Sequence, residues 1–277
     1  DYFARAGSNP QLRELLSWAT AIGVPIAVVG SGSNLLIADK GVPGLVIKLD
    51  RKLAQVQHEG QRLVCGGGAR LPSVAARAAQ AGLSGIEFGV NIPGSVGGAL
   101  RMNANAYGGQ LADTLEWAEI VTAQGIERRA AAQLGFGYRH SNLAAGEVVA
   151  RASFLLSPAG VDTVKATLAE MRARRHEAQP QGIKTFGSTF KNPQEDPKAE
   201  GRSAGLLLSE AECNGLTVGG ARFAPKHANF IENMGTATTA EVVALMAEGR
   251  HRVIERFGVD LEPEVQTLGA VRFPWRD

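Results

Sequence analysis

Hydrophobic residues recur every three or four positions in five segments of this chain, which is the pattern of helices buried along one face. Gly23 follows the first of these segments and Gly82 follows the second, where glycine commonly ends a helix. We therefore predict helices over residues 9–22, 71–81, 161–176, 204–213 and 239–257.

Short apolar runs bounded by glycine, serine or asparagine are typical of strands. Such runs predict strands over residues 25–29, 35–37, 45–49, 63–65, 115–121, 148–156 and 228–232. Residues 86–107 fit neither pattern, because glycines and asparagines interrupt an otherwise apolar segment. We expect this segment to be irregular and buried, and to wrap a ligand.

The length and composition of the chain are those of a globular protein with two domains. Its 277 residues exceed the roughly 100–200 residues of a typical single domain. Hydrophobic residues make up 44% of the chain and charged residues 20%, a balance that supplies a packed core. Because a loop-like SPAG sequence occupies residues 157–160, we predict domains over residues 1–157 and 158–277.

Charge, cysteines and the lengths of apolar runs argue against several kinds of protein and site. The net charge of +2 comes from nearly balanced acids and bases and gives no reason to expect a nucleic-acid surface. Cys65 and Cys213 lie in no metal-ligand spacing, so we expect no metal site and two buried cysteines. No apolar run approaches the roughly 18–20 residues of a membrane span, and no signal-like segment follows Asp1. We expect a cytoplasmic protein without membrane contact.

A glycine-rich loop follows the strand predicted at residues 25–29. It consists of Gly30, Ser31, Gly32, Ser33 and Asn34, whose backbone N–H groups suit a close approach to phosphate. The loop matches neither the Walker A motif nor the dinucleotide-binding glycine fingerprint. Taken alone, it is interpreted more readily as a plain turn than as a binding loop.

A second glycine-rich loop lies within residues 86–107 and changes this balance. Three glycines within five residues permit close backbone approach, and nearby asparagines can hydrogen-bond to a polar ring. A tightly packed buried loop is the alternative. Two such loops in one half of the chain favour a bound dinucleotide with a pyrophosphate. The second set of candidate cofactor-binding residues is Gly94, Ser95, Gly97, Gly98 and Asn103.

Six motifs, in a fixed order, connect the chain to a known family. They are GSGSNLLI at 30–37, GIEFGVNIPGSVGGALRMNANAYGG at 85–109, GYRHS at 137–141, GSTFKNP at 187–193, GARFAPKHANFI at 220–231 and LEPEV at 261–265. Through these motifs the chain resembles the UDP-N-acetylenolpyruvoylglucosamine reductase (MurB) family over almost its whole length. The short spacing between Arg139 and Ser188 resembles the compact type II form, which lacks an inserted tyrosine-bearing loop.

The resemblance implies an α+β protein with two domains. The first would have the two-subdomain FAD-binding fold of the vanillyl-alcohol-oxidase (PCMH) type, with the first glycine loop on the pyrophosphate of FAD and the second around the isoalloxazine. The second would be an α+β substrate-binding domain, and we expect a monomer. The family's opening strand, with a TxxxGG-like segment, has no match, so we expect this N-terminal strand to be missing. Asn105 stands where the family usually has glycine.

The resemblance also implies a reaction. Hydride passes from NADPH to FAD and then to UDP-N-acetylglucosamine-enolpyruvate, which yields UDP-N-acetylmuramate for peptidoglycan synthesis. Arg139 suits stabilisation of the resulting enolate, because a planar guanidinium matches a carboxylate. Ser188 would protonate the enolate carbon. Glu264, in the second domain, would donate a hydrogen bond to the enolate or orient Arg139. We expect Glu262 to face solvent.

Ammonium and amide groups near these residues suit the diphosphate and the sugar of such a substrate. The predicted substrate-binding residues are Tyr138, Lys191, Asn192, Lys226 and His227. Each of three has a structural alternative: Tyr138 as a packing residue, Lys226 as a cap, and His227 as a satisfied structural histidine.

Two other functions compete with this interpretation. Another FAD-dependent oxidoreductase of the same fold, acting on an alcohol or hydroxy acid, would share the first domain. The GSTFKNP and LEPEV motifs of the second domain argue against it. A non-catalytic nucleotide-sugar-binding protein would use the glycine loops only as turns, and flavin absorption in the purified protein would rule it out.

Overall fold

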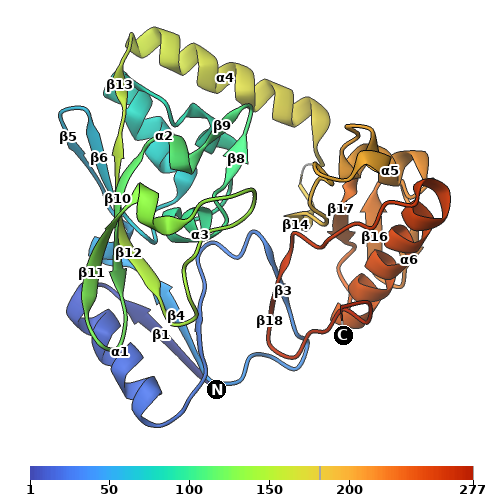
Figure 1. Ribbon diagram of the computed structural model, residues 1–277, viewed down its shortest axis with the longest axis horizontal. Helices are drawn as coiled ribbons and strands as arrows, with labels where there is room; N and C mark the ends of the chain where they lie inside the picture. The colour runs from blue at the N-terminus through green and yellow to red at the C-terminus, as the bar shows by residue number, and fades with distance from the viewer. Residues whose placement is uncertain (181, 277) are drawn as a thin grey trace. The chain divides into compact units, whose positions relative to one another are not determined.

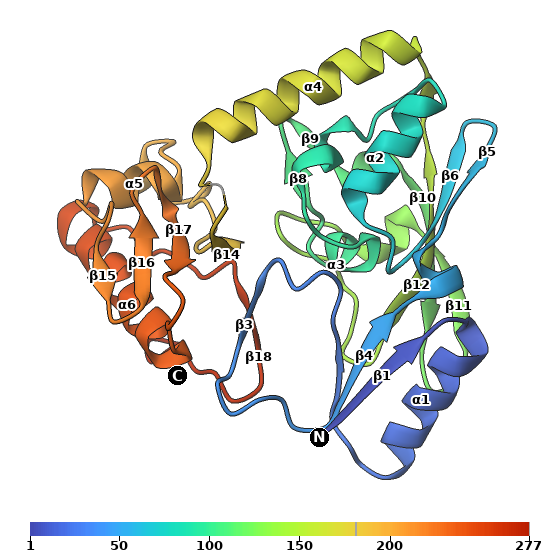
Figure 2. The same cartoon turned by 180° about the vertical axis from the view of Figure 1, so that it is seen from behind.

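The chain forms two compact units in the computed structural model, which describes residues 1–180 and 182–276 (Figure 1). The first unit comprises Asp1–Ser31 and Pro43–Arg175, and the second comprises Gly32–Val42 and His176–Asp277. The chain therefore passes from one unit to the other three times, and the short segment 32–42 belongs with the C-terminal residues. Figure 2 shows the same ribbon from behind.

A small parallel sheet and one helix open the first unit. In spatial order its strands are β1 (Tyr2–Ala6), β4 (Leu45–Leu49) and β2 (Ile26–Val28). Helix α1 (Asn9–Ala21) begins after Ser8, whose hydroxyl accepts the N–H of Gln11, and it packs on the sheet through residues such as Leu12 and Leu16. The helix predicted at 9–22 is thus confirmed, whereas β1 was missed because its first residues are exposed and lack alternation.

A five-stranded antiparallel sheet forms the remainder of the first unit's core. In spatial order its strands are β11 (Ile126–Ala130), β10 (Leu115–Val121), β12 (Val148–Leu155), β6 (Arg62–Gly66) and β5 (Val56–Glu59). Helices α2 (Leu71–Gln80) and α3 (Val96–Arg101) share its hydrophobic core. The three inner strands were predicted. The two edge strands were missed because they are polar and largely exposed.

Residues 86–107 contain more regular structure than we predicted. Within them lie a 3-10 helix (Glu87–Asn91), helix α3 and strand β8 (Asn105–Ala106), which pairs with β9 (Gly109–Gln110). The buried residues of α3, Val96, Ala99 and Leu100, have helical spacing. The expectation of an irregular segment was therefore wrong for α3, because tertiary burial of this apolar face outweighs the poor helix propensity of its two glycines.

Helix α4 (Val161–Ala178) places the boundary between the compact units later than residue 157. Its buried Val164 and Leu168 pack with residues of α2 in one hydrophobic cluster. Arg175 donates a hydrogen bond to the carbonyl of Asn91, and burial lowers the pKa of its guanidinium. Because these contacts hold α4 against the first unit, the division falls between Arg175 and His176. Short strands β7 (Leu83–Ser84) and β13 (Ser157–Pro158) pair just before α4.

The second unit is built on a four-stranded antiparallel sheet. In spatial order its strands are β14 (Lys184–Ser188), β17 (His227–Asn233), β16 (Ala221–Ala224) and β15 (Thr217–Val218). Helices α5 (Ala204–Glu210) and α6 (Thr239–Phe257) contribute to the same hydrophobic core, and both were predicted. Cys213 is buried in this core and Cys65 in that of the first unit, as expected, and burial raises the pKa of both thiols, to about 11 and about 12.

Segment 32–42 is tied to the second unit by a strand pair and a helix terminus. Strand β3 (Leu35–Ile37) pairs in parallel with β18 (Gln266–Leu268). The Asp39 carboxylate accepts the backbone N–H of Thr239, the first residue of α6, at 2.9 Å and its hydroxyl at 2.9 Å. Negative charge is favourable at a helix N-terminus. No helix within residues 1–180 or 182–276 has the length and apolar character to cross a membrane.

Replacement of Asp39 by alanine should destabilise the second unit. The substitution removes an acceptor from the N-terminus of α6, a loss that typically costs about 1 kcal/mol. Urea unfolding of Asp39→Ala and of Asp39→Asn measures the effect, and Asn should retain most of the stability because its side-chain oxygen still accepts. Equal stability of Asp39→Ala and wild type would show that this contact does not hold segment 32–42.

Candidate active site

The two glycine-rich loops meet within the first unit. A Cβ atom added to Gly30 would lie 2.1 Å from the hydroxyl oxygen of Ser95, far inside contact distance. Only glycine therefore allows the first loop to approach the second this closely. Ser95 is 3% exposed, and its hydroxyl accepts the N–H of Gly98 at 3.4 Å as the N-cap of α3.

The second loop is built tightly onto residues 67–71. The N–H groups of Val96 and Gly97 donate to the carbonyls of Ala69 and Gly67 at 2.9 and 2.7 Å. The carbonyl of Gly94 in turn accepts a backbone N–H from the start of α2 at 3.0 Å. These hydrogen bonds fix the backbone path of the second loop.

The first loop offers backbone donors. Among the described residues, the N–H groups of Gly30, Ser31, Gly32 and Ser33 make no hydrogen bond to another protein group. Gly32 has a φ of 71°, in the left-handed region that favours glycine. Consecutive free N–H groups in such a turn form an anion-binding nest, so this loop fits the pyrophosphate of a dinucleotide such as FAD.

Asn103 connects the second loop to the motif that carries Arg139. Its side-chain amide donates to the carbonyl of Gly137 at 3.1 Å and to the side chain of Gln110 at 3.0 Å, and its oxygen accepts the N–H of Ala112 at 3.2 Å. The residue is 2% exposed. The side chain that we predicted to bind cofactor is thus committed to internal hydrogen bonds.

Tyr138 and Arg139 occupy the two central positions of a tight turn. Gly137 and His140 exchange backbone hydrogen bonds of 3.1 and 3.3 Å across it. Arg139 has a φ of 53°, unusual for a residue with a side chain, and its guanidinium carbon lies 5.3 Å from the centre of the Tyr138 ring. Both side chains are partly buried on the first unit.

Ser188 is the last residue of β14 and pairs with Phe230 of β17. The preceding Gly187 has a φ of 82°, and a Cβ atom there would lie 3.5 Å from the carbonyl oxygen of Ser33. The Ser188 side chain is partly exposed, and its hydroxyl makes no hydrogen bond within the described part of the chain. The two residues that follow Ser188 are fully buried.

Glu264 lies beside Ser188 in the second unit because the LEPEV segment pairs with GSTFKNP. The Glu264 N–H donates to the carbonyl of Thr189 at 2.9 Å, and Phe190 forms an antiparallel bridge with Pro263. The Asn34 side chain donates to the carbonyl of Glu264 at 3.2 Å. Residues 32–34, 187–190 and 263–265 therefore meet in one place, although they are far apart in the sequence.

Four predicted substrate-binding residues make structural contacts within the second unit. The ammonium of Lys191 pairs with the exposed Glu262 at 3.0 Å, and Asn192 accepts the N–H of Ala204 at the start of α5 at 3.0 Å. Lys226 donates to the carbonyl of His176 at 2.9 Å near the end of α4, as the capping alternative predicts.

His227 also has a structural environment. Its Nδ1 accepts the N–H of Asn229 at 3.3 Å, its ring meets Phe230 edge to face at 4.9 Å, and a Cβ atom on Gly205 would lie 2.7 Å from its Cε1. Burial lowers the pKa of the imidazole. These contacts favour the structural alternative, a partly buried histidine whose hydrogen bond and ring contact are made within the protein.

Asn229 is a residue of this site that sequence reasoning missed. Its side chain accepts the N–H of Phe190 at 2.9 Å and donates to the carbonyl of the same residue at 2.9 Å, and its own carbonyl accepts the N–H of Thr189 at 2.8 Å. Asn229 is 4% exposed. The GARFAPKHANFI motif contains it, but a buried asparagine that pairs with distant backbone has no local signal.

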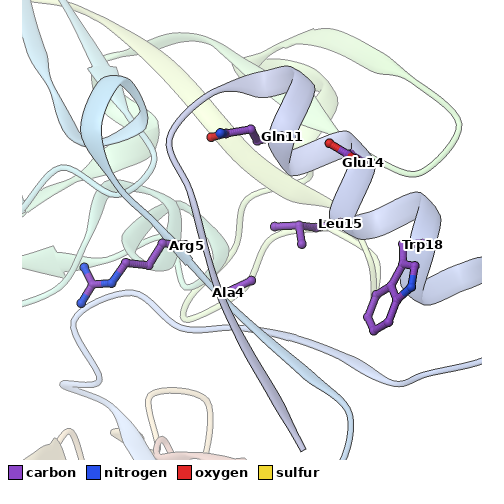
Figure 3. A pocket seen from close by; sticks show the side chains of 6 residues that line it. All are labelled: Ala4, Arg5, Gln11, Glu14, Leu15 and Trp18. Atoms are coloured by element: carbon purple, nitrogen blue, oxygen red, sulfur yellow. The ribbon is translucent and has the colours of Figure 1, made fainter.

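A surface hollow on the first unit lies apart from these residues. Side chains of β1 and α1 line it: Ala4, Arg5, Gln11, Glu14, Leu15 and Trp18 (Figure 3). Arg5 pairs with Asp50 at 3.1 Å. None of the predicted site residues lines this hollow, and we assign it no function.

Comparison with known proteins identifies the two parts of the chain. Residues 1–131 match a family model described as an FAD binding domain, and residues 179–268 match the C-terminal domain of UDP-N-acetylenolpyruvoylglucosamine reductase. An FAD-binding domain of the predicted PCMH type followed by this C-terminal domain defines an FAD-binding oxidoreductase, and the predicted α+β fold class is confirmed.

Individual relatives narrow the class to one family. UDP-N-acetylenolpyruvoylglucosamine reductase of Gluconobacter oxydans is 43% identical over 247 residues, which cover 89% of this chain and 79% of the relative. That of Agathobacter rectalis is 41% identical and covers 97% and 88%. The crystal structure of the Thermus caldophilus reductase aligns with a TM-score of 0.82 at 35% identity over 96% and 91% of the two chains. This chain belongs to the UDP-N-acetylenolpyruvoylglucosamine reductase family.

Substitution of Gly30 by alanine should weaken flavin binding. The added Cβ would displace Ser95 or push the two loops apart, and overpacking of this kind costs about 1–3 kcal/mol. A cost of that size corresponds to a rise of about fivefold to about 150-fold in the dissociation constant of FAD. Flavin absorbance per mole of purified Gly30→Ala, followed by titration with FAD, measures the loss. The matched control is Gly125→Ala, where an added Cβ meets no atom within 4 Å and φ is not left-handed. Equal flavin content in both variants would contradict the assignment of the loop.

Removal of the Asn229 side chain should destabilise the second unit. Asn229→Ala leaves the buried N–H and carbonyl of Phe190 unpaired, which costs about 1–3 kcal/mol. Asn214→Ala is the control, because Asn214 is exposed and donates only to the carbonyl of Pro225 at 3.0 Å. Urea unfolding measures the free energy of unfolding of both variants. If both variants lose the same amount, the two hydrogen bonds between Asn229 and Phe190 do not contribute to stability as proposed.

Proposed function

We propose that this chain reduces UDP-N-acetylglucosamine-enolpyruvate to UDP-N-acetylmuramate in peptidoglycan precursor synthesis, with NADPH as the reductant. We also propose that the protein acts in the cytoplasm as a monomer. Family membership supports the overall reaction. The observation that carries the assignment of chemistry is the pairing of residues 189–191 with residues 262–264, because it brings Glu264 next to Thr189, the residue that follows Ser188.

The reaction adds one hydride and one proton across the vinyl double bond. The hydride comes from NADPH through FAD, which supplies two-electron transfer when bound. Addition to the terminal vinyl carbon leaves the electron pair on the carbon that bears the carboxylate, where it is delocalised as an enolate. A proton delivered to that carbon completes the lactyl ether, and NADPH leaves as NADP⁺.

Ser188 is the proposed proton donor. A serine hydroxyl is a weak acid, so it can protonate only a strongly basic carbon that it holds within hydrogen-bond reach. Two features support this role: the hydroxyl donates to no acceptor among the described residues, and the strand pairing with Phe230 fixes the backbone of Ser188. After protonation of the carbon, a solvent proton restores the hydroxyl.

Arg139 and Glu264 are proposed to stabilise the enolate. A guanidinium is planar and can present two parallel N–H donors to a carboxylate, which suits Arg139 to this role. The carboxyl group of Glu264 would donate a hydrogen bond to an enolate oxygen, a form of stabilisation that counts most where charge develops. Its backbone is held by Thr189 and Asn34, so the side chain starts from a fixed position.

Lys191 and Tyr138 are the remaining proposed substrate contacts. The ammonium of Lys191 is paired with an exposed carboxylate, and a diphosphate can compete with such a pair because exposed salt bridges are worth little. The ring of Tyr138 packs beside Arg139 and would contact the same part of the substrate. The side chains of Asn192, Lys226 and His227 instead contact backbone groups within the second unit.

The substitution Ser188→Ala separates the two half-reactions. We expect the variant to bind FAD and to be reduced by NADPH at the wild-type rate, because neither step uses the hydroxyl. Reoxidation of the flavin by UDP-N-acetylglucosamine-enolpyruvate should slow by about 10²-fold or more, the usual contribution of a general acid. Stopped-flow absorbance at the flavin band measures each half-reaction separately.

The control for this experiment is Ser209→Ala, the same change at an exposed position of α5. It should leave both half-reactions unchanged. A Ser188→Ala variant that is reoxidised by substrate at the wild-type rate would remove Ser188 from the mechanism. A purified protein that binds FAD but oxidises no NADPH in the presence of this substrate would overturn the proposed function as a whole.

A further inference from the structure

The turn that carries Arg139 is held at both of its ends by the C-terminal end of α3. The carbonyl of Gly137, the residue before Tyr138, accepts a hydrogen bond from the Asn103 side chain at 3.1 Å. The hydroxyl of Ser141, two residues after Arg139, donates to the carbonyl of Arg101 at 2.9 Å. Asn103 is 2% exposed and Ser141 is 7% exposed, so both side chains that hold the turn are buried residues.

The side chain of Asn103 has no N–H left for a ligand. One amide hydrogen serves Gly137 and the other serves Gln110, whose side-chain amide donates in turn to Asp113 at 2.8 Å. An asparagine amide has two N–H donors, and both are used. Asn103 itself has a φ of 38°, a region that asparagine tolerates better than most residues.

The chain that follows the turn is anchored by the same end of α3. The guanidinium of Arg101 donates to the carbonyls of Leu143 and Glu147, each at 2.9 Å, and to that of Ala144 at 3.3 Å. The carboxylate of Glu147 accepts the N–H of Ala144 at 2.8 Å, which closes this loop on itself. The segment after Ser141 therefore cannot shift without the loss of several hydrogen bonds.

The backbone of Arg139 needs this support. A left-handed conformation is strained for a residue with a long side chain, and it persists only where surrounding contacts determine it. The backbone bonds between Gly137 and His140 close the turn, but they do not tie it to the rest of the unit. Asn103 and Ser141 provide that tie.

We infer that Asn103 and Ser141 are positioning residues for the Arg139 turn, and that the side chain of Asn103 is not a ligand of FAD. Through these two residues, the C-terminal end of α3 also sets the direction of the Arg139 guanidinium. The inference that this setting matters for catalysis rests on the proposed role of Arg139.

The substitution Asn103→Asp tests the inference. Aspartate has the same shape and tolerates the same backbone angle, but it cannot donate to Gly137 or Gln110. Hydrogen exchange of residues 136–141 should accelerate by about tenfold, the factor that corresponds to loss of about one hydrogen bond. Reoxidation of the flavin by substrate should slow through kcat by a similar factor, while flavin content and reduction by NADPH remain at wild-type values.

Two further variants keep the test decisive. Ser141→Ala removes the hydrogen bond at the other end of the turn without introducing a buried charge, and it should also accelerate exchange of residues 136–141. This variant tests the inference even if Asn103→Asp does not fold. Asn142→Asp is the matched control, because this exposed amide lies in the same loop but donates to the carbonyl of Gln133 at 2.8 Å. It should leave exchange of residues 136–141 and substrate reoxidation unchanged.

The outcomes separate this inference from the proposed function. Unchanged exchange of residues 136–141 in both Asn103→Asp and Ser141→Ala overturns the inference, as does loss of flavin from Asn103→Asp with normal exchange, which would make Asn103 a cofactor ligand. Equal effects in Asn142→Asp also overturn it. Faster exchange of residues 136–141 with normal reoxidation by substrate would support the inference that Asn103 and Ser141 hold the turn. If Arg139→Lys then also turned over at the wild-type rate, the proposed role of Arg139 would be rejected while the inference about the turn would stand.

Discussion

The hydrogen bond from the N–H of Glu264 to the carbonyl of Thr189 is the contact on which the geometry of the proposed site in the second unit depends. It sets the register between two segments that are distant in the sequence. Side chains alternate along extended chains, so a slip of one residue would exchange the direction of Ser188 with that of the buried Thr189. Asn229 opposes such a slip because it binds both backbone groups of Phe190. The direction of the proposed proton donor is therefore set by backbone pairing and one buried amide.

The first unit uses the same device at the turn of Arg139. Its glycine-rich segments lack a regular ladder of backbone hydrogen bonds, yet buried N–H and carbonyl groups must still be paired. Side chains such as Ser95 and Asn103 supply the partners. Polar residues within the motifs thus bind backbone groups, and a motif alone does not distinguish this role from ligand binding.

The first glycine loop belongs partly to each unit. Gly30 packs against Ser95 in the first unit, whereas Asn34 binds the carbonyl of Glu264 in the second, and the division falls between Ser31 and Gly32. Asp39 then joins the same segment to the start of α6.

The long helices, the inner strands and the six ordered motifs could be predicted from the residues alone, and the motifs in turn indicated the FAD-binding fold and the family. These features depend on short-range periodicity or on residue order, both of which are legible in one dimension. Three features became visible only in the folded protein: α3 forms in a glycine-rich segment, α4 packs on the first unit as far as Arg175, and Asn103 and Asn229 bind backbone groups. Each of these outcomes depends on partners far away in the chain, and buried polar groups take whichever partner the fold brings within hydrogen-bond distance.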